Sequence, residues 1–332
     1  MSFIRKLFQR ISSERFDKPT TSHLPEERHV GRIKTLQPKV LCIIHNPTIR
    51  PGKDRKLSRL MNWNDPDDLA QRYISDLFEC SAGHVRYEIV ERIEIDGYPL
   101  KADGFAYNEG SYMDALKTQK GFHQPDEVDY HSILLDHRVV QRVNHGEIDE
   151  LWLFAFPYAG YYESIMAGPG AFWCNAPPID QTDHSSRRFI IMGFNYERGV
   201  GEMLENFGHR VESILSYVYR NHRGESNMWA RFTRHEASHP GQAACGSVHF
   251  APNSERDYDW GNRRVVFSSC GDWFAYPNLS GTKQRVTCAE WGNGDIRLHH
   301  KWWLGHLPLA TGYRDGIAND WWAYAIDPNL VS

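Results

Sequence analysis

One stretch of the chain, Phe194–Val218, combines residue types and spacing that suit catalysis. Its apolar residues recur with helical periodicity, so we expect a helix. At about 100° per residue, several acidic and histidine side chains then share one narrow face, an arc of roughly 80° that also holds Arg198. These side chains are Glu202, Glu205, His209 and Glu212. Carboxylates and imidazoles placed this way can bind a metal ion or transfer protons.

A structural explanation of this face competes with the catalytic one, because a charged face opposite an apolar face is usually just exposed to water. However, the face contains no Lys, and its Glu residues repel one another unless a cation or a proton intervenes. Gly199, Gly201 and Gly208 weaken the helix by up to about 1 kcal/mol each, so another segment should approach its backbone closely. Arg198 and Arg210 could instead supply the neutralising charge.

The sharper hypothesis is a divalent metal site, with zinc as the expected ion. Glu205 and His209 are four residues apart and His209 and Glu212 three, so either pair can reach one ion. The spacing is not His-Glu-x-x-His, so it does not identify a zinc protease. We predict His209, Glu212, His249 and His300 as ligands, and Glu205 as the general base that activates a bound water.

The elements that must position these residues alternate along the chain. Apolar or β-rich runs predict strands, and periodic segments with capping residues predict helices. The strands are expected at 40–45, 85–95, 148–156 and 188–194, and the helices at 68–79, at 126–144 and from about 197 onward. This order predicts an α/β fold with a mostly parallel sheet flanked by helices.

Ligands bind at the carboxyl ends of the strands in such a sheet, so the loops after the first, third and fourth strands should meet at one edge. These loops carry most of the predicted rim residues. We predict four catalytic residues, Glu163, Glu197, Arg198 and Glu205. The predicted substrate-binding residues are Asn175, Asn195 and Tyr196, with Trp302 and Trp303 from the C-terminal region.

We divide the chain into a basic arm (1–37), an α/β body (38–224) and a loop-rich, Trp- and His-rich layer (225–332) packed on the body. Short β-like runs are expected in that layer at 247–250, 264–268 and 285–288. A single histidine is usually structural, but three between 299 and 306, beside two Trp residues, are harder to explain that way. The charged helix face is catalytic only if this layer covers it.

Three functions follow as hypotheses. The first is a metal-dependent hydrolase acting on a peptide or amide bond, with its site between the helix at 197–219 and the C-terminal histidines. The second is a metal-free glycosidase or carbohydrate-binding protein, because acidic residues repeatedly adjoin Trp residues after position 224. The third is a non-catalytic binding protein. A thiol nucleophile at Cys174 is a further, nonspecific option.

Several classes lack support. Phosphate-binding and dinucleotide-binding glycine motifs are absent, so we expect no nucleotide cofactor. Residues 1–60 hold 14 Lys and Arg against 5 Asp and Glu, so they carry +9 and the rest of the chain carries −13. An acidic body argues against a nucleic-acid partner. The substrate is therefore expected to be a small molecule, a peptide or a carbohydrate.

The location is predicted from what the sequence lacks. It contains no apolar run long enough to span a membrane and no secretory signal. We therefore predict a cytoplasmic protein with reduced cysteines. Cys270 and Cys288 lie in neighbouring strand-like segments, so export by another route would allow a bridge between them. Residues 3–11 form an amphipathic segment that suits weak contact with a membrane surface. We favour instead a terminal helix that is either frayed or docked on the protein itself.

Overall fold

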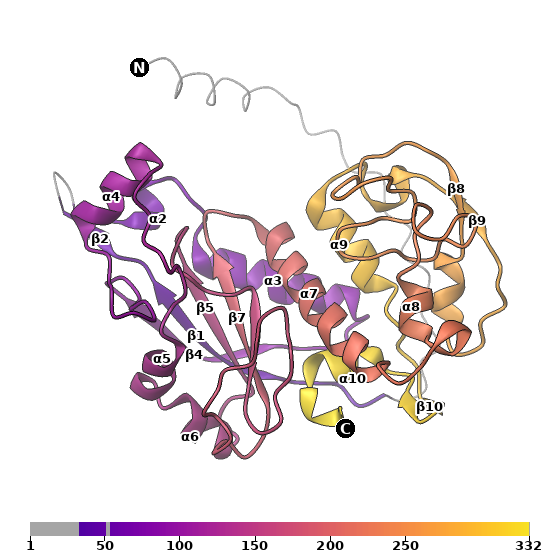
Figure 1. Ribbon diagram of the computed structural model, residues 1–332, viewed down its shortest axis with the longest axis horizontal. Coiled ribbons are helices and arrows are strands. Elements are labelled where there is room, and N and C mark those ends of the chain that lie inside the picture. The colour runs from indigo at the N-terminus through magenta and orange to yellow at the C-terminus, as the bar shows by residue number, and fades with distance from the viewer. Residues whose placement is uncertain (1–32, 51–53, 332) are drawn as a thin grey trace.

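The computed structural model describes residues 33–50 and 54–331. Its main sheet has five strands in the order β4-β1-β5-β7-β6 (Figure 1). Four strands are parallel, and β6 runs antiparallel to β7. The bounds are β1 Lys39–His45, β4 Glu88–Ile95, β5 Glu150–Ala155, β6 Ser164–Ala167 and β7 Phe189–Asn195. The predicted α/β fold with a mostly parallel sheet is confirmed, and the short β6 was missed.

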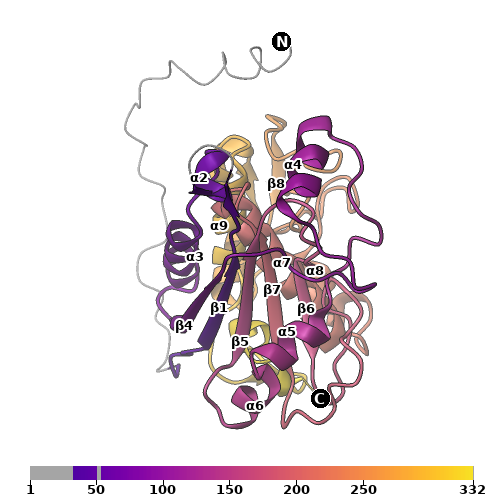
Figure 2. The ribbon, with the colours of Figure 1, turned by 90° about the vertical axis from the view of Figure 1, so that its left-hand side faces the viewer.

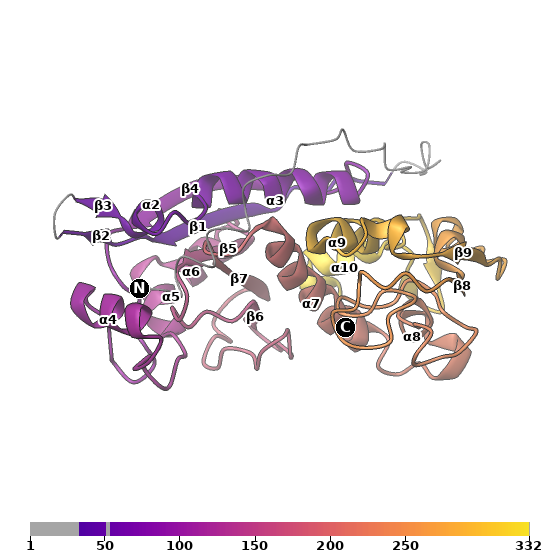
Figure 3. The same ribbon diagram turned by 90° about the horizontal axis from the view of Figure 1, so that it is seen from above.

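Helices cover both faces of this sheet (Figures 2 and 3). One face packs against α3 (Pro66–Cys80) and α7 (Val200–Val218), and the other against α5 (Tyr130–Asp136) and α6 (Val139–Asn144). Alternate residues of β1 therefore enter different cores, which explains why this strand reads as one continuous apolar run. From β1 the chain moves outward to β4 and then returns past β1 to β5. The strand order thus reverses between β1 and β5.

Local signals place most of these helices correctly. Asp65 accepts a hydrogen bond from the Asp67 N–H at the start of α3, and Pro66 occupies its first turn. The single helix predicted at 126–144 is wrong, because Arg138 adopts a left-handed conformation with φ 52° and separates α5 from α6. Elements not predicted are β2 (Thr48–Ile49), β3 (Arg55–Lys56), α2 (Leu57–Leu60) and α4 (Glu109–Thr118).

The C-terminal region packs against the far side of α7 (Figure 1). It contains α8 (Met228–Phe232), β8 (Val266–Ser268), β9 (Gln284–Val286), α9 (Ile296–Gly305), β10 (Tyr313–Arg314), β11 (Ile317–Ala318), α10 (Trp321–Ile326) and short 3-10 turns η2 (Gly224–Ser226), η3 (Cys270–Ala275), η4 (Cys288–Trp291) and η5 (Pro328–Leu330). The strand predicted at 247–250 is a tight turn, in which Ser247 and Phe250 exchange backbone hydrogen bonds. One hydrophobic core runs from the sheet through α7 into this region.

Two glycines let the C-terminal region approach α7. A Cβ atom at Gly201 would lie 2.5 Å from Ile296 Cγ2, and one at Gly208 would lie 2.5 Å from Val248 Cγ2. The expectation that another segment approaches the glycine-rich helix is therefore confirmed. The cost of glycine in a helix is offset by close packing of α9 and of the turn around residue 248.

Arg210 does not neutralise the acidic face of α7. It is fully buried and donates from Nη2 to Glu150 Oε1 at 2.7 Å and to the Ile326 carbonyl at 3.2 Å. Tyr87 and Trp152 also donate to the Glu150 carboxylate. This ion pair joins α7, β5 and the end of α10 inside the core.

The predicted segment at 3–11 and most of the arm at 1–37 lie outside the described residues. Within residues 33–50 and 54–331, no helix is long and apolar enough to cross a membrane. All six cysteines are free and buried, Cys270 and Cys288 included.

Candidate functional site

The acidic face of α7 meets the C-terminal region at three side chains. His249 Nε2 lies 3.1 Å from Glu205 Oε1, and His209 Nε2 lies 3.9 Å from the same oxygen. One ligand atom from each of Glu205, His209 and His249 lies within 4.8 Å of the other two. Glu205 is only 7 % exposed. Among the described residues, this is the group of three that could hold a metal ion.

Both histidines are oriented by a second carboxylate. His209 Nδ1 lies 3.1 Å from Glu212 Oε2, and His249 Nδ1 lies 3.1 Å from Asp257 Oδ1. A carboxylate can only accept, so it favours hydrogen on Nδ1 of each ring. In both rings Nε2 faces Glu205, which is also an acceptor, so either a proton or a metal ion has to lie between them. Carboxylate, histidine and metal are arranged in this order in many protein metal sites.

The pKa values of the three side chains depend on burial and on the charges next to them. Burial favours neutral His209, but its hydrogen bond to Glu212 and the surrounding carboxylates outweigh burial and raise its pKa. The hydrogen bond to Glu205 raises the pKa of His249, against the effects of burial and of His209. Burial opposes ionisation of Glu205, yet the neighbouring histidines lower its pKa. Positive charge is therefore favourable at this position, whether protons or a metal ion supply it.

Tyr258 covers the His249 ligand atom. Its hydroxyl lies 2.9 Å from His249 Nε2, and the two ring centroids are 4.2 Å apart. Partial burial and the charge of Glu205 raise the pKa of Tyr258 to about 12, so the phenol is a neutral donor. Tyr258 is 52 % exposed, and its ring also packs edge-on against Trp260.

Two of the four predicted ligands, His209 and His249, come together, and two do not take that role. Glu212 uses Oε2 for His209 and Oε1 for the Val248 N–H. His300 is fully buried on α9, its Nε2 lies 3.2 Å from the Val248 carbonyl, and burial lowers its pKa to about 4. Glu205, predicted as the base, lies instead at the centre of the group.

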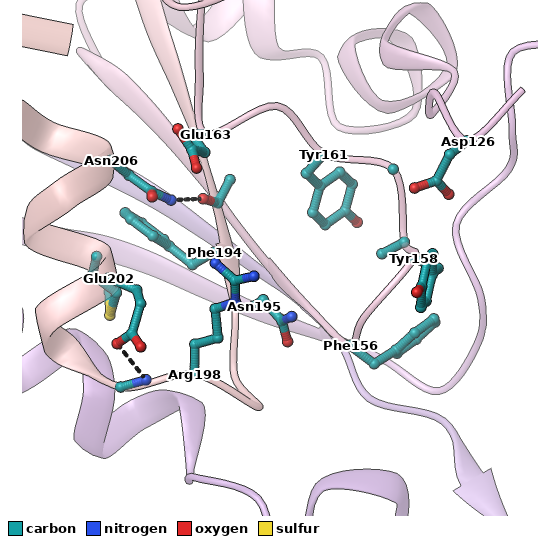
Figure 4. A pocket seen from close by; sticks show the side chains of 15 residues that line it. Asp126, Phe156, Tyr158, Tyr161, Glu163, Phe194, Asn195, Arg198, Glu202 and Asn206 are labelled. Atoms are coloured by element: carbon teal, nitrogen blue, oxygen red, sulfur yellow. Dashed lines mark hydrogen bonds between the residues drawn. The ribbon is translucent and has the colours of Figure 1, made fainter. Parts of the chain in front are cut away.

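A pocket of about 200 Å³ adjoins this cluster (Figure 4). It lies between the carboxyl ends of β5 and β7 and the first turns of α7, on the other side of β5 from the reversal of strand order between β1 and β5. Its side chains are predominantly polar or aromatic: Asp126, Phe156, Tyr158, Tyr161, Glu163, Phe194, Asn195, Arg198, Glu202, Met203 and Asn206. Glu163 connects the two features, because its Oε2 lies 3.9 Å from His209 Nε2.

Most predicted rim residues reach this pocket or support it. Glu163, Asn195 and Arg198 line it. Asn175 donates from Nδ2 to Glu163 Oε2 at 2.6 Å and therefore orients that carboxylate. Its loop does not follow a parallel strand as predicted: it follows the antiparallel β6 and returns toward the carboxyl edge. Glu197 is exposed and is not among the residues that line the pocket.

Three residues predicted to bind substrate are structural instead. Tyr196 is fully buried, and its hydroxyl donates to the His45 carbonyl at 3.2 Å. Trp303 is also fully buried, and its indole donates to the Gly246 carbonyl. Trp302 packs against Trp291 and the ring of His306. Tyr196 and Trp303 fill the core, because large buried rings with one satisfied polar group are well suited to it, and Trp302 lies partly buried against it.

The features behind the other hypotheses are also buried. Trp260, Trp273, Trp291, Trp321 and Trp322 are each at most 6 % exposed, so they offer no platforms for sugar rings. Cys174 is fully buried, and burial raises the pKa of its thiol to about 11, which does not suit a nucleophile.

Sequence reasoning missed several residues of the site. Asp257 and Tyr258 lie close to Trp260 in the acid- and Trp-rich part of the sequence, and their contacts with His249 depend on how that loop folds. Asp126 and Tyr158 come from loops with no motif. Asn206 has a usable signal, since it lies one turn after Glu202 on the same helix.

Comparison with protein-family models, with curated proteins and with solved structures found no match to this chain. The function must therefore be argued from the site itself.

Proposed function

We propose that the protein is a metal-dependent hydrolase in which Glu205, His209 and His249 hold a divalent ion, with zinc as the expected metal. The observation that supports this most directly is the shared orientation of the two histidines. Each has its Nδ1 next to a carboxylate and its Nε2 turned toward Glu205. Three ligands of these types leave a coordination position for water, as in catalytic zinc sites.

A divalent ion at this position would make water more acidic and polarise a carbonyl group. Glu163 then has the properties of a general base. Asn175 donates to one Glu163 oxygen at 2.6 Å. The Glu163 side chain is 41 % exposed and lies beside His209. Glu163 thus replaces Glu205 in the role that the sequence suggested, because Glu205 is needed as a ligand.

The proposed reaction is hydrolysis of an amide bond. The water oxygen bonds to the carbonyl carbon while the water proton passes to Glu163. The carbon–nitrogen bond then breaks as Glu163 returns that proton to the leaving nitrogen, which gives a carboxylic acid and an amine. The neutral Tyr258 phenol, once turned from His249, can donate a hydrogen bond to the carbonyl oxygen as negative charge develops there.

Turnover by metal-loaded protein tests this function. Protein treated with a chelator, then loaded with Zn²⁺, Co²⁺ or Mn²⁺, is assayed against a library of dipeptides and N-acyl amino acids. We expect activity that depends on the metal, at least 100-fold lower in His209→Gln, His249→Gln and Glu163→Gln. His131→Gln is the matched control, because His131 also pairs with a carboxylate, Asp180, but on α5.

Full activity in chelated protein would contradict the proposal, and so would equal activity in the Glu163→Gln variant. Loss of activity in the His131→Gln control would mean that the variants report on folding rather than on the site. The cytoplasmic location inferred from the sequence stays a prediction.

A further inference from the structure

We propose that Arg198 binds a carboxylate group of the substrate, so that the hydrolysed bond lies close to a free carboxylate. The location of the bond rests on the proposed function, whereas anion binding does not. Figure 4 shows the Arg198 side chain extending from the start of α7 into the pocket, among Glu163, Asn195 and Phe194.

The backbone holds Arg198 in a fixed position. Its N–H donates to the Asn195 carbonyl at 3.0 Å, and its own carbonyl accepts from Asn64 Nδ2 at 2.9 Å. The following residue, Gly199, is capped by Glu202. A guanidinium on such a fixed turn loses less conformational freedom when it binds a ligand than one on a mobile loop.

The carboxylates around Arg198 already have donors of their own. Asp126 accepts from the buried Lys101 at 2.6 Å, Glu202 accepts from the Gly199 N–H at 3.1 Å, and Glu163 accepts from Asn175. Arg198 itself forms no ion pair with any residue that the structure describes. The pocket therefore contains a solvent-exposed cation that is open to an anionic ligand.

The surroundings favour a carboxylate over a phosphate. Asn195 uses Oδ1 for the Glu197 N–H, so its Nδ2 offers a second donor beside the guanidinium. A planar carboxylate suits a guanidinium with one neighbouring amide donor. A phosphate dianion would suffer roughly twice the repulsion from Asp126, Glu163 and Glu202.

The position of Glu163 then orients the substrate. Glu163 lies at the side of the pocket next to His209, and Arg198 lies further along the same pocket. A substrate whose carboxylate binds Arg198 presents its nearest amide bond to Glu163. We infer that N-acyl amino acids or peptides with a free C-terminal carboxylate are the substrate class.

Binding to chelated, metal-free protein tests the anion site without requiring turnover. Calorimetry compares N-acetylphenylalanine with its amide, and inorganic phosphate serves as a second probe. We expect wild type to bind the acid at least about tenfold more tightly than the amide, which lacks the charge-assisted pair. The acid should also bind more tightly than phosphate, because the carboxylates of the pocket repel a dianion more strongly. Arg198→Gln should abolish the preference for the acid, and Arg198→Lys should keep part of it. Arg285→Gln, an exposed arginine of β9, is the matched control.

Equal binding of acid and amide by wild type overturns the proposal. It is also overturned if the preference persists in Arg198→Gln, if phosphate binds more tightly, or if neither probe binds at millimolar concentration. If the acid binds as expected but loaded protein has no hydrolytic activity, the proposed function fails while the anion site stands. If turnover occurs, Arg198→Gln should raise KM for the acid about tenfold and leave KM for the amide unchanged.

Discussion

Replacing Glu212 by Gln should weaken zinc binding although Glu212 is not one of the proposed ligands. Its Oε2 accepts from His209 Nδ1 at 3.1 Å, and its Oε1 accepts from the Val248 N–H at 2.9 Å. A glutamine can still accept from Val248 through its oxygen. Its NH₂ group then faces His209 Nδ1 and favours the tautomer with hydrogen on Nε2, the atom that must bind the metal.

The magnitude follows from this one contact. A hydrogen bond to a charged group contributes about 1.5–3 kcal/mol, and loss of a carboxylate behind a metal-binding histidine typically lowers affinity about 10- to 100-fold. We expect a loss of that size in Glu212→Gln, measured by zinc titration against a competing chelator. Asp257→Asn should act in the same way through His249, with a smaller effect because Asp257 is more exposed.

Glu202→Gln is the control for this experiment. Glu202 lies on the same helix, but its carboxylate caps the Gly199 N–H rather than a histidine. Its replacement should leave zinc affinity within about twofold of wild type. Wild-type affinity in both Glu212→Gln and Asp257→Asn would refute the proposed order of carboxylate, histidine and metal.

Three predictions concern the frame that positions the site. Burial lowers the pKa of His45 to about 4 from 6.5, so below pH 6.5 the unfolded chain gains a proton that the native state does not take up. His45 should contribute about 3 kcal/mol to the fall in stability between pH 6.5 and 4, in addition to the contribution of the buried His300. Urea unfolding should therefore show a shallower fall in His45→Gln, where the side chain can still accept from Tyr161, and equal slopes would contradict this. Arg210→Met should lower the free energy of unfolding by about 3–5 kcal/mol, because it leaves Glu150 charged and buried. Adding Glu150→Gln should restore part of that stability, and a further loss in the double variant would argue against this explanation. Gly208→Ala should lower stability by about 1–3 kcal/mol and weaken zinc binding, because its Cβ displaces Val248 and with it His249. Gly305→Ala should do neither, because a Cβ there meets no atom within 4 Å. Similar effects at both positions would exclude this explanation.

The sequence predicts the parts of this protein that depend on local pattern. The apolar runs at β1, β5 and β7 identify buried parallel strands, and the periodicity of α7 places Glu205 and His209 on one face. The glycines of that helix correctly indicate close packing.

The rest depends on contacts between distant segments. Nothing local shows that Asp257 reaches His249, or that the turn at 247–250 places His249 against Glu205. The Trp-rich run around 302 forms α9, whose packing buries His300 and Trp303 away from the pocket. Residue type alone could not separate those core side chains from ligands, because histidine and tryptophan serve both purposes.

Anomalous scattering at the zinc edge, from crystals grown with Zn²⁺, tests the central claim most directly. We predict one peak bound by a Glu205 oxygen and by Nε2 of His209 and of His249, with zinc–nitrogen distances of about 2.0–2.1 Å. No peak at this position, or a zinc ion held by other residues while these three side chains keep their present contacts, would contradict the account.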